Sequence, residues 1–233
     1  LTLTLGAGDG AGAGAGAGAE AEAEAGAGAE AEAEAEAEAE AEAEAEAEAL
    51  AEAIAKAMAE GDSYYREGSL YDVNNGWRAY YFKLAIASYN KAIRLDPQPA
   101  NAYYKKGLVY DELGQYELAI SDFDEAIRLE PQHANAYYNR GLAYYELGQY
   151  EKAIQDFSEA TRLNPNDYYI HYRKAEAYME LEEYELAIQD YTEAIRLAPE
   201  WATPYLGRGE TFQALGNSIQ AEQDFAKYRE LKE

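Results

Sequence analysis

Two patterns of apolar and polar residues follow one another along the 233-residue chain, and they meet near residue 60. Before that point, Ala alternates with Gly until about Ala19 and, after a mixed stretch, with Glu from Ala29 to Glu48. After it, large apolar side chains recur at spacings of three and four residues, which is the period of amphipathic helices. We therefore expect an all-α region preceded by a low-complexity arm.

The end of the arm has the pattern of a helix. Ala and Glu both favour helix, but a Glu at every second residue appears on all sides of it, so most of the Ala-Glu stretch gives no apolar face. Leu50, Ile54 and Met58 then recur at four-residue steps on one face. We expect a helix over about 30–60 that packs through its last turns and ends at Gly61.

The first residues carry weaker signals. Leu1–Leu5 alternates like a short strand, and Gly6–Ala11 fits the loose G-x-G-x-x-(G/A) pattern of dinucleotide-binding loops. That pattern needs an amphipathic helix and a second strand, whereas here the Gly-Ala alternation continues, so we expect no cofactor. The Gly/Ala-rich residues 1–28 and the Ala/Glu-rich residues 29–60 resemble no family. They are typical of low-complexity or engineered sequence, or of positions whose true side chains are unknown.

After the arm, several residue types recur every 34 positions. A repeat of this length indicates a stacked array of small units. The recurring positions are Pro97, Pro131, Pro165 and Pro199; Gly107, Gly141, Ala175 and Gly209; Tyr110, Tyr144, Tyr178 and Phe212; Ala85, Ala119, Ala153, Ala187 and Ala221; and Tyr89, Phe123, Phe157, Tyr191 and Phe225.

This spacing and these residue types resemble the tetratricopeptide repeat (TPR) family, and residues 136–165, AYYNRGLAYYELGQYEKAIQDFSEATRLNP, are close to its consensus. The resemblance covers residues 61–233 and implies a right-handed α-solenoid of about five helix-turn-helix units. The first unit has five additional residues around Asn74–Arg78, which we expect to lengthen its turn. The expected units are 61–99, 100–133, 134–167, 168–201 and 202–233.

The residues give physical reasons for such units. Small residues such as Gly141 and Ala153 let the two helices of a unit approach closely, and Phe157 fills the space beside them. A glycine such as Gly148 suits the turn between the helices, and each proline ends the second helix. In the last unit Tyr228 occupies a position that is Ala in the others, which suits a terminal unit.

Charge and composition exclude several functions. The net charge of −26 repels phosphate, so we expect no nucleic-acid partner. The chain has no Cys, and no apolar run reaches the roughly 20 residues of a membrane span. We expect His133 in a solvated loop and His171 in a packing position, and neither belongs to a nucleophile or metal motif. We therefore expect no enzymatic activity, no catalytic residue and no metal site, and nothing indicates a compartment.

The TPR resemblance implies a concave groove, formed by the first helix of each unit, that binds an extended peptide or a helix. Aromatic rings can stack on a peptide backbone, and polar side chains can pair with its carbonyls or with an acidic group. Two rows recur at 34-residue steps, namely the tyrosine row of Tyr104, Tyr138 and Tyr172 and the polar row of Lys105, Asn139 and Arg173. The full candidate groove is Asn101, Tyr104, Lys105, Leu108, Asn135, Tyr138, Asn139, Leu142, Tyr145, Tyr169, Tyr172, Arg173, Glu176 and Met179.

The same positions test for the carboxylate clamp of TPR proteins that bind chaperone tails. The clamp needs Lys and Asn on one helix, Asn on the next and Lys and Arg on the third. Asn139 and Arg173 match, whereas Tyr104, Leu108 and Tyr169 occupy the remaining positions. We therefore do not expect binding of a chaperone C-terminal tail.

Together these features predict a non-enzymatic interaction scaffold whose partner is a protein or peptide of unknown identity. The alternative is a structural subunit of a homo-oligomer or filament, natural or designed. Such a subunit would assemble through residues 1–60, either by adding a strand to a sheet edge or by adding a helix to a bundle.

Overall fold

A computed structural model describes residues 15–232 of the chain, and its side chains from Glu34 onward. This part is all-helical, with no strand, and no helix in it is long and apolar enough to cross a membrane. Leu1–Leu5 and Gly6–Ala11 lie outside the described residues. The helices are α1 (Ala15–Ser69), α2 (Gly76–Leu95), α3 (Ala100–Glu112), α4 (Tyr116–Leu129), α5 (Ala134–Glu146), α6 (Tyr150–Leu163), α7 (Tyr168–Glu180), α8 (Tyr184–Leu197), α9 (Thr203–Ala214) and α10 (Ser218–Lys232).

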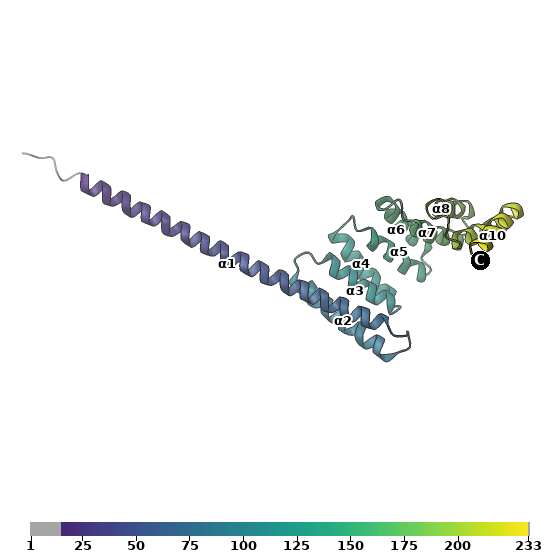
Figure 1. Cartoon of the computed structure of the whole chain (residues 1–233), viewed down its shortest axis with the longest axis horizontal. Helices are drawn as coiled ribbons and strands as arrows, with labels where there is room; N and C mark the ends of the chain where they lie inside the picture. Colours follow the sequence, from purple (N-terminus) through teal and green to yellow (C-terminus); the bar gives the residue numbers. More distant parts are fainter. Residues whose placement is uncertain (1–14, 233) are drawn as a thin grey trace, which may run out of the picture. The chain divides into compact units, whose positions relative to one another are not determined.

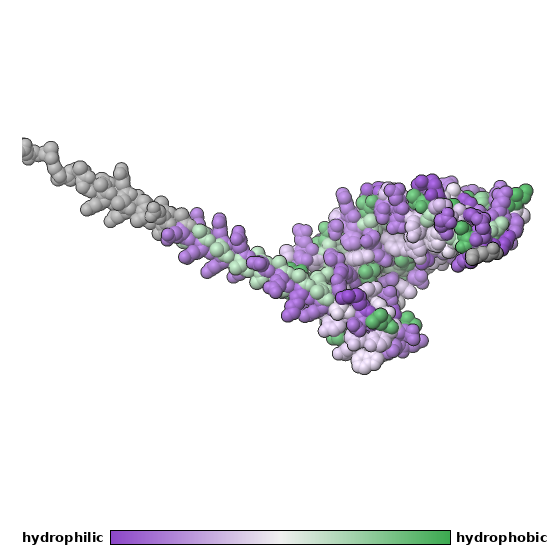
Figure 2. All heavy atoms as spheres, in the orientation of Figure 1, coloured by the Kyte–Doolittle hydropathy of each residue, from purple (hydrophilic) through white to green (hydrophobic). Residues whose placement is uncertain are grey.

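Helix α1 contains most of the arm and also the first helix of the repeat array. Residues 34–52 are exposed, and Figure 2 shows their Glu and Ala side chains alternating along the helix. From Ala53 the chain belongs to a second compact unit, in which Ala57 is fully buried.

The expectation that this helix ends at Gly61 is wrong, because α1 continues to Ser69. A Cβ on Gly61 would lie 2.5 Å from the ring of Tyr89 in α2. The glycine therefore allows two helices to approach closely and does not stop the first one.

From α3 onward the helices pack in consecutive antiparallel pairs, α3 with α4, α5 with α6, α7 with α8 and α9 with α10, and each pair packs on the next (Figure 1). Small residues allow the close approach within a pair, as expected. A Cβ on Gly141 would lie 2.7 Å from the ring of Phe157. Phe157 itself is fully buried and clusters with Ile170 of the following pair. Such aromatic residues therefore join neighbouring units as well as the two helices of one unit.

The turns inside the units depend on a left-handed residue. Gly114 and Gly148 have φ of +68° and Gly216 has φ of +76°, a region that glycine enters without strain. In the fourth unit the same position is Glu182, with φ of +59°. For a residue with a Cβ this backbone conformation is unfavourable by about 1–2 kcal/mol, so this turn keeps the geometry without the residue best suited to it.

The additional residues of the first unit lengthen its turn, as expected, and also its second helix. Helix α2 has 20 residues, whereas its counterpart α4 has 14. The Asn75 side chain caps the N-terminus of α2 by accepting a hydrogen bond of 2.9 Å from the Trp77 backbone N–H. Arg78, in the added turn, donates to the Tyr71 carbonyl at 3.3 Å and forms an ion pair with Glu112.

A buried ion pair joins the two helices in each of the last four units. The basic side chain comes from the first helix, and the aspartate lies 16 residues later on the second helix. Burial raises the pKa of Asp156 although Arg140 opposes the shift, so burial outweighs the favourable pairing. The pairs are Lys106–Asp122 at 2.9 Å, Arg140–Asp156 at 2.6 Å, Lys174–Asp190 at 3.0 Å and Arg208–Asp224 at 2.7 Å.

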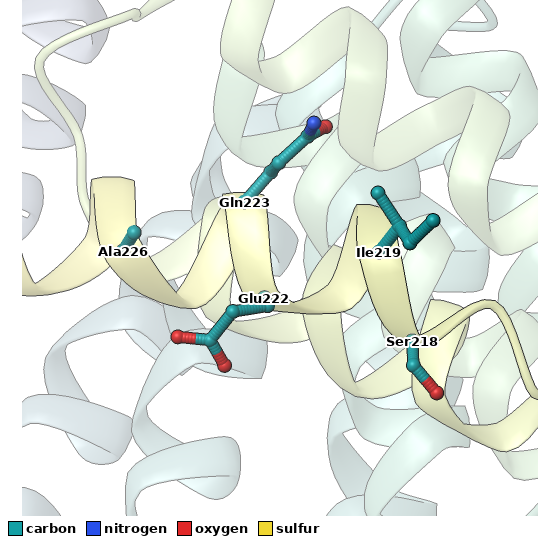
Figure 3. A pocket seen from close by; sticks show the side chains of 5 residues that line it. All are labelled: Ser218, Ile219, Glu222, Gln223 and Ala226. Carbon is teal, nitrogen blue, oxygen red and sulfur yellow. The ribbon is translucent and has the colours of Figure 1, made fainter.

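Two positions of α10 are charged where the second unit has isoleucine. Glu222 and Arg229 stand three repeats after Ile120 and Ile127, and they form an ion pair of 2.7 Å. A hollow of about 510 Å³ on the surface of α10 is lined by residues of this helix alone (Figure 3). Because no second element encloses it, it is open to solvent. Its residues are Ser218, Ile219, Glu222, Gln223 and Ala226.

Candidate functional site

The predicted groove residues all lie on the first helices of three successive units, α3, α5 and α7. Most are half-buried, whereas Asn101, Asn135 and Tyr169 are exposed at the start of their helices. Predicted groove residues of neighbouring units contact one another directly: Asn139 donates to the Tyr104 hydroxyl at 3.1 Å, and the rings of Tyr138 and Tyr169 lie 6.3 Å apart. These contacts bring together residues that are about one repeat apart in the sequence.

Rings from the loops that follow the second helices, or from the next first helix, cover the tyrosine row. The His133 ring lies 4.6 Å from Tyr104, and the Trp201 ring lies 4.8 Å from Tyr172. Tyr138 instead meets Tyr169, which packs against Trp201 at 5.4 Å. Burial of this kind raises the pKa of Tyr138 far above its usual value. A ligand would therefore meet ring edges and hydroxyls more than open ring faces.

His133 and Trp201 correct and extend the sequence analysis. His133 lies in the loop before α5, as expected, but it is half-buried and not solvated, and its Nδ1 accepts a hydrogen bond of 3.2 Å from the Ala136 backbone N–H. Trp201 was not among the candidates. Both lie 29 residues after the tyrosine that they cover, a recurrence that is visible in the sequence.

Each member of the polar row already has a partner within the protein. The Lys105 ammonium is 2.7 Å from Asp62 Oδ1, and Asn139 donates to the Asn135 carbonyl at 2.8 Å. Arg173 donates to Glu176 at 2.9 Å, and its guanidinium lies 5.4 Å from the Tyr169 ring centre. A peptide in the groove would therefore share or replace these bonds, which makes the row selective for well-placed acceptors.

A cavity of about 300 Å³ lies between the last turns of α1 and helix α3. Asp62 stands in its wall and also accepts a hydrogen bond of 2.8 Å from the Tyr89 hydroxyl. The predicted groove did not include the first unit. Tyr65 is nevertheless the counterpart of Tyr104, because the 39 residues between them are one 34-residue repeat plus the five additional residues of the first unit. The lining residues are Asp62, Tyr65, Arg66, Tyr89, Tyr104, Lys105 and Leu108.

Carboxylates crowd together at the C-terminal ends of α3 and α5. Burial raises the pKa of Asp111 to about 6, and the neighbouring Glu112 and Glu146 add to the shift. At neutral pH this aspartate is therefore a charged group in an unfavourable environment.

We expect the Asp111→Asn variant to be more stable than the parent above pH 6. The raised native pKa means that the folded protein binds more protons than the unfolded one between about pH 4 and 6, so stability falls as pH rises through this range. The free energy of unfolding should rise by about 1–2 kcal/mol at pH 8. This is less than the free energy that corresponds to the whole pKa shift, because water still reaches the side chain. It should vanish near pH 4. Urea unfolding at both pH values measures it, and an equal gain at both would contradict the assignment.

His171 occupies the packing position that we expected. It is buried, and its Nδ1 lies 2.8 Å from Asp190 Oδ1, the oxygen that also pairs with Lys174. Within residues 34–232, no group of three or more His, Cys, Asp or Glu side chains is arranged to hold a metal ion. The histidine is thus part of the packing between α7 and α8.

Sequence comparison decides the family. A family model of the tetratricopeptide repeat matches residues 104–168 and 138–202, and a second model, of the TPR repeat, matches residues 82–114. Together they span residues 82–202, which is more than half of the chain. The chain belongs to the tetratricopeptide repeat family. No curated protein matches the sequence.

Solved TPR structures share this fold. One crystal structure of the MamA protein is 25% identical, with a TM-score of 0.69, and covers 78% of this chain and 93% of its own. MamA from Desulfovibrio magneticus RS-1 is 22% identical, with a TM-score of 0.64, and covers 74% and 95%. YrrB, a TPR protein with an unusual peptide-binding site, is 24% identical, with a TM-score of 0.60, and covers 66% and 79%. These similarities establish a TPR α-solenoid.

Proposed function

We propose that the chain is a non-enzymatic interaction scaffold that binds a peptide or a helix in the candidate groove. The observation that supports this most directly is the regular placement of the tyrosine and polar rows on the first helices of successive TPR units. A solenoid presents such helices as one extended surface, and TPR repeats are interaction modules. The peptide-binding site described for YrrB, a protein of the same fold, is consistent with the proposal.

The geometry indicates what the groove would recognise. Tyr104 and Tyr138 offer hydroxyls and ring edges, while Lys105 and Arg173 offer charged donors that are already oriented by Asp62 and Glu176. Donors held in place lose little side-chain entropy on binding. An extended backbone, with a free carbonyl at every second residue on each side, suits such a row of donors.

We expect the double variant Tyr138→Ala, Arg173→Ala to bind groove ligands at least about tenfold more weakly, because Tyr and Arg are the side chains that most often dominate interfaces. The ligands would be peptides selected by phage display against the full chain, with affinity measured by fluorescence anisotropy. The matched control is Tyr184→Ala, Arg196→Ala, which removes the same side-chain types from α8.

A control variant that loses as much affinity as the groove variant would show that the effect is not local to the groove. Unchanged affinity in the groove variant would remove the proposal. Circular dichroism and the less disruptive pair Tyr138→Phe, Arg173→Lys separate loss of binding from loss of packing, because this pair keeps most of the side-chain volume. Assembly through residues 1–60 stays a prediction.

A further inference from the structure

Three carboxylates stand at the C-terminal ends of the first helices, which also carry the candidate groove residues. Asp111 lies on α3, Glu146 on α5 and Glu180 on α7. We call them the acidic strip. Asp111 and Glu146 are close enough for their charges to repel, and Glu180 accepts a hydrogen bond of 3.5 Å from the Tyr145 hydroxyl. The strip therefore continues over three successive units.

The protein does not neutralise this strip from within. Among the described side chains no Lys, Arg or His forms a salt bridge with Asp111, Glu146 or Glu180. The nearby cations are engaged elsewhere: Arg78 pairs with Glu112, and Arg173 pairs with Glu176. The strip carries negative charge that a partner can compensate.

Aromatic rings and a cavity accompany these carboxylates. The Tyr145 and Tyr150 rings meet edge to face at 5.3 Å. A cavity of about 330 Å³ is lined by Asp111 and Tyr116, and also by Arg78, whose charge is compensated by Glu112 in the same wall. Carboxylates beside tyrosine rings bind Lys and Arg well, because a cation gains both an ion pair and a cation–π contact there.

We propose that the acidic strip binds the Lys or Arg side chains of the peptide held in the groove, so the partner presents a positively charged segment. This inference rests on the proposed function and adds the chemistry of the ligand. The described carboxylates form no metal-binding group, and an acidic peptide or a nucleic acid would be repelled. Neighbouring strip residues stand 34 or 35 positions apart, one on each unit. The partner should therefore carry several basic residues along an extended segment.

The test compares two triple variants of the full chain. Asp111→Asn, Glu146→Gln, Glu180→Gln neutralises the strip. Glu125→Gln, Glu159→Gln, Glu193→Gln removes the same charge at 34-residue spacing from the second helices, where each Glu only pairs with an exposed Arg. The probes are fluorescein-labelled oligolysine and oligoglutamate of equal length, titrated at low and high salt. Oligolysine also binds the Glu-rich arm, but the arm is identical in both variants.

We expect the strip variant to bind oligolysine about tenfold more weakly than the control variant, with the difference decreasing at high salt because exposed charges are screened. Oligoglutamate should bind neither variant. Equal oligolysine affinity in the two variants would overturn the inference. The proposed function is tested separately: if display-selected peptides still depend on Tyr138 and Arg173, the groove remains a binding site and only the assignment of a basic partner falls.

Discussion

Replacing Arg140 by Met should destabilise the protein by about 3–5 kcal/mol, because the substitution leaves a buried aspartate without its cation. Arg140 donates to both oxygens of Asp156, from Nε at 2.7 Å and from Nη2 at 2.6 Å, and only 7% of the Asp156 side chain is exposed. Met keeps most of the length of the Arg side chain, so the loss reports on charge more than on volume. Urea unfolding at neutral pH measures it.

Two further variants make the interpretation specific. Arg162→Met breaks the exposed pair with Glu159 in the same unit and should change stability by no more than about 0.5 kcal/mol. Adding Asp156→Asn to Arg140→Met should restore a large part of the loss, since the buried charge is removed. Similar losses for Arg140→Met and Arg162→Met, or no recovery in the double variant, would contradict a buried charge as the cause.

Phe157→Ala should also lower the stability by about 3–5 kcal/mol, through the apolar surface and the cavity that it leaves. The ring is fully buried, lies beside Gly141, and clusters with Ile170 of the next unit. Loss of this ring should therefore weaken both the packing inside the third unit and its attachment to the fourth.

The equivalent ring of the last unit provides the control. Phe225 lies against Gly209 as Phe157 lies against Gly141, but it is only half-buried. We expect Phe225→Ala to cost clearly less than Phe157→Ala, because the cavity term grows with burial. Chemical denaturation of both variants measures the difference, and equal losses would show that packing between units adds little at this position.

The repeat period accounts for most of what could be predicted. A 34-residue recurrence of small, aromatic and proline residues is a strong signal, because each type is required at one place in the helix pair. Gly148 illustrates this: the turn needs a positive φ, and glycine is the residue that adopts it without strain. The all-α solenoid, the close helix approach at Gly141 and the packing position of His171 follow from the same reasoning.

The features that were missed depend on contacts in the folded protein or on ambiguous residues. Gly61 could equally end a helix or allow a close approach, and only the position of the Tyr89 ring distinguishes the two. The buried pairs were visible as basic residues and aspartates that recur together, such as Lys106 and Asp122, but their burial requires the packed structure. The covering of Tyr172 by Trp201 likewise depends on the path of the loop between α8 and α9, which the period alone does not give.

The continuity of α1 has a practical consequence for dissecting the chain. Ala57 packs with Ala92 and Ala102, and Met58 lies against the same cluster. A shortened protein that begins at Gly61 would leave this apolar surface open to water and would be prone to aggregate. A fragment intended to keep the solenoid intact should begin before Ala53, where the second compact unit starts.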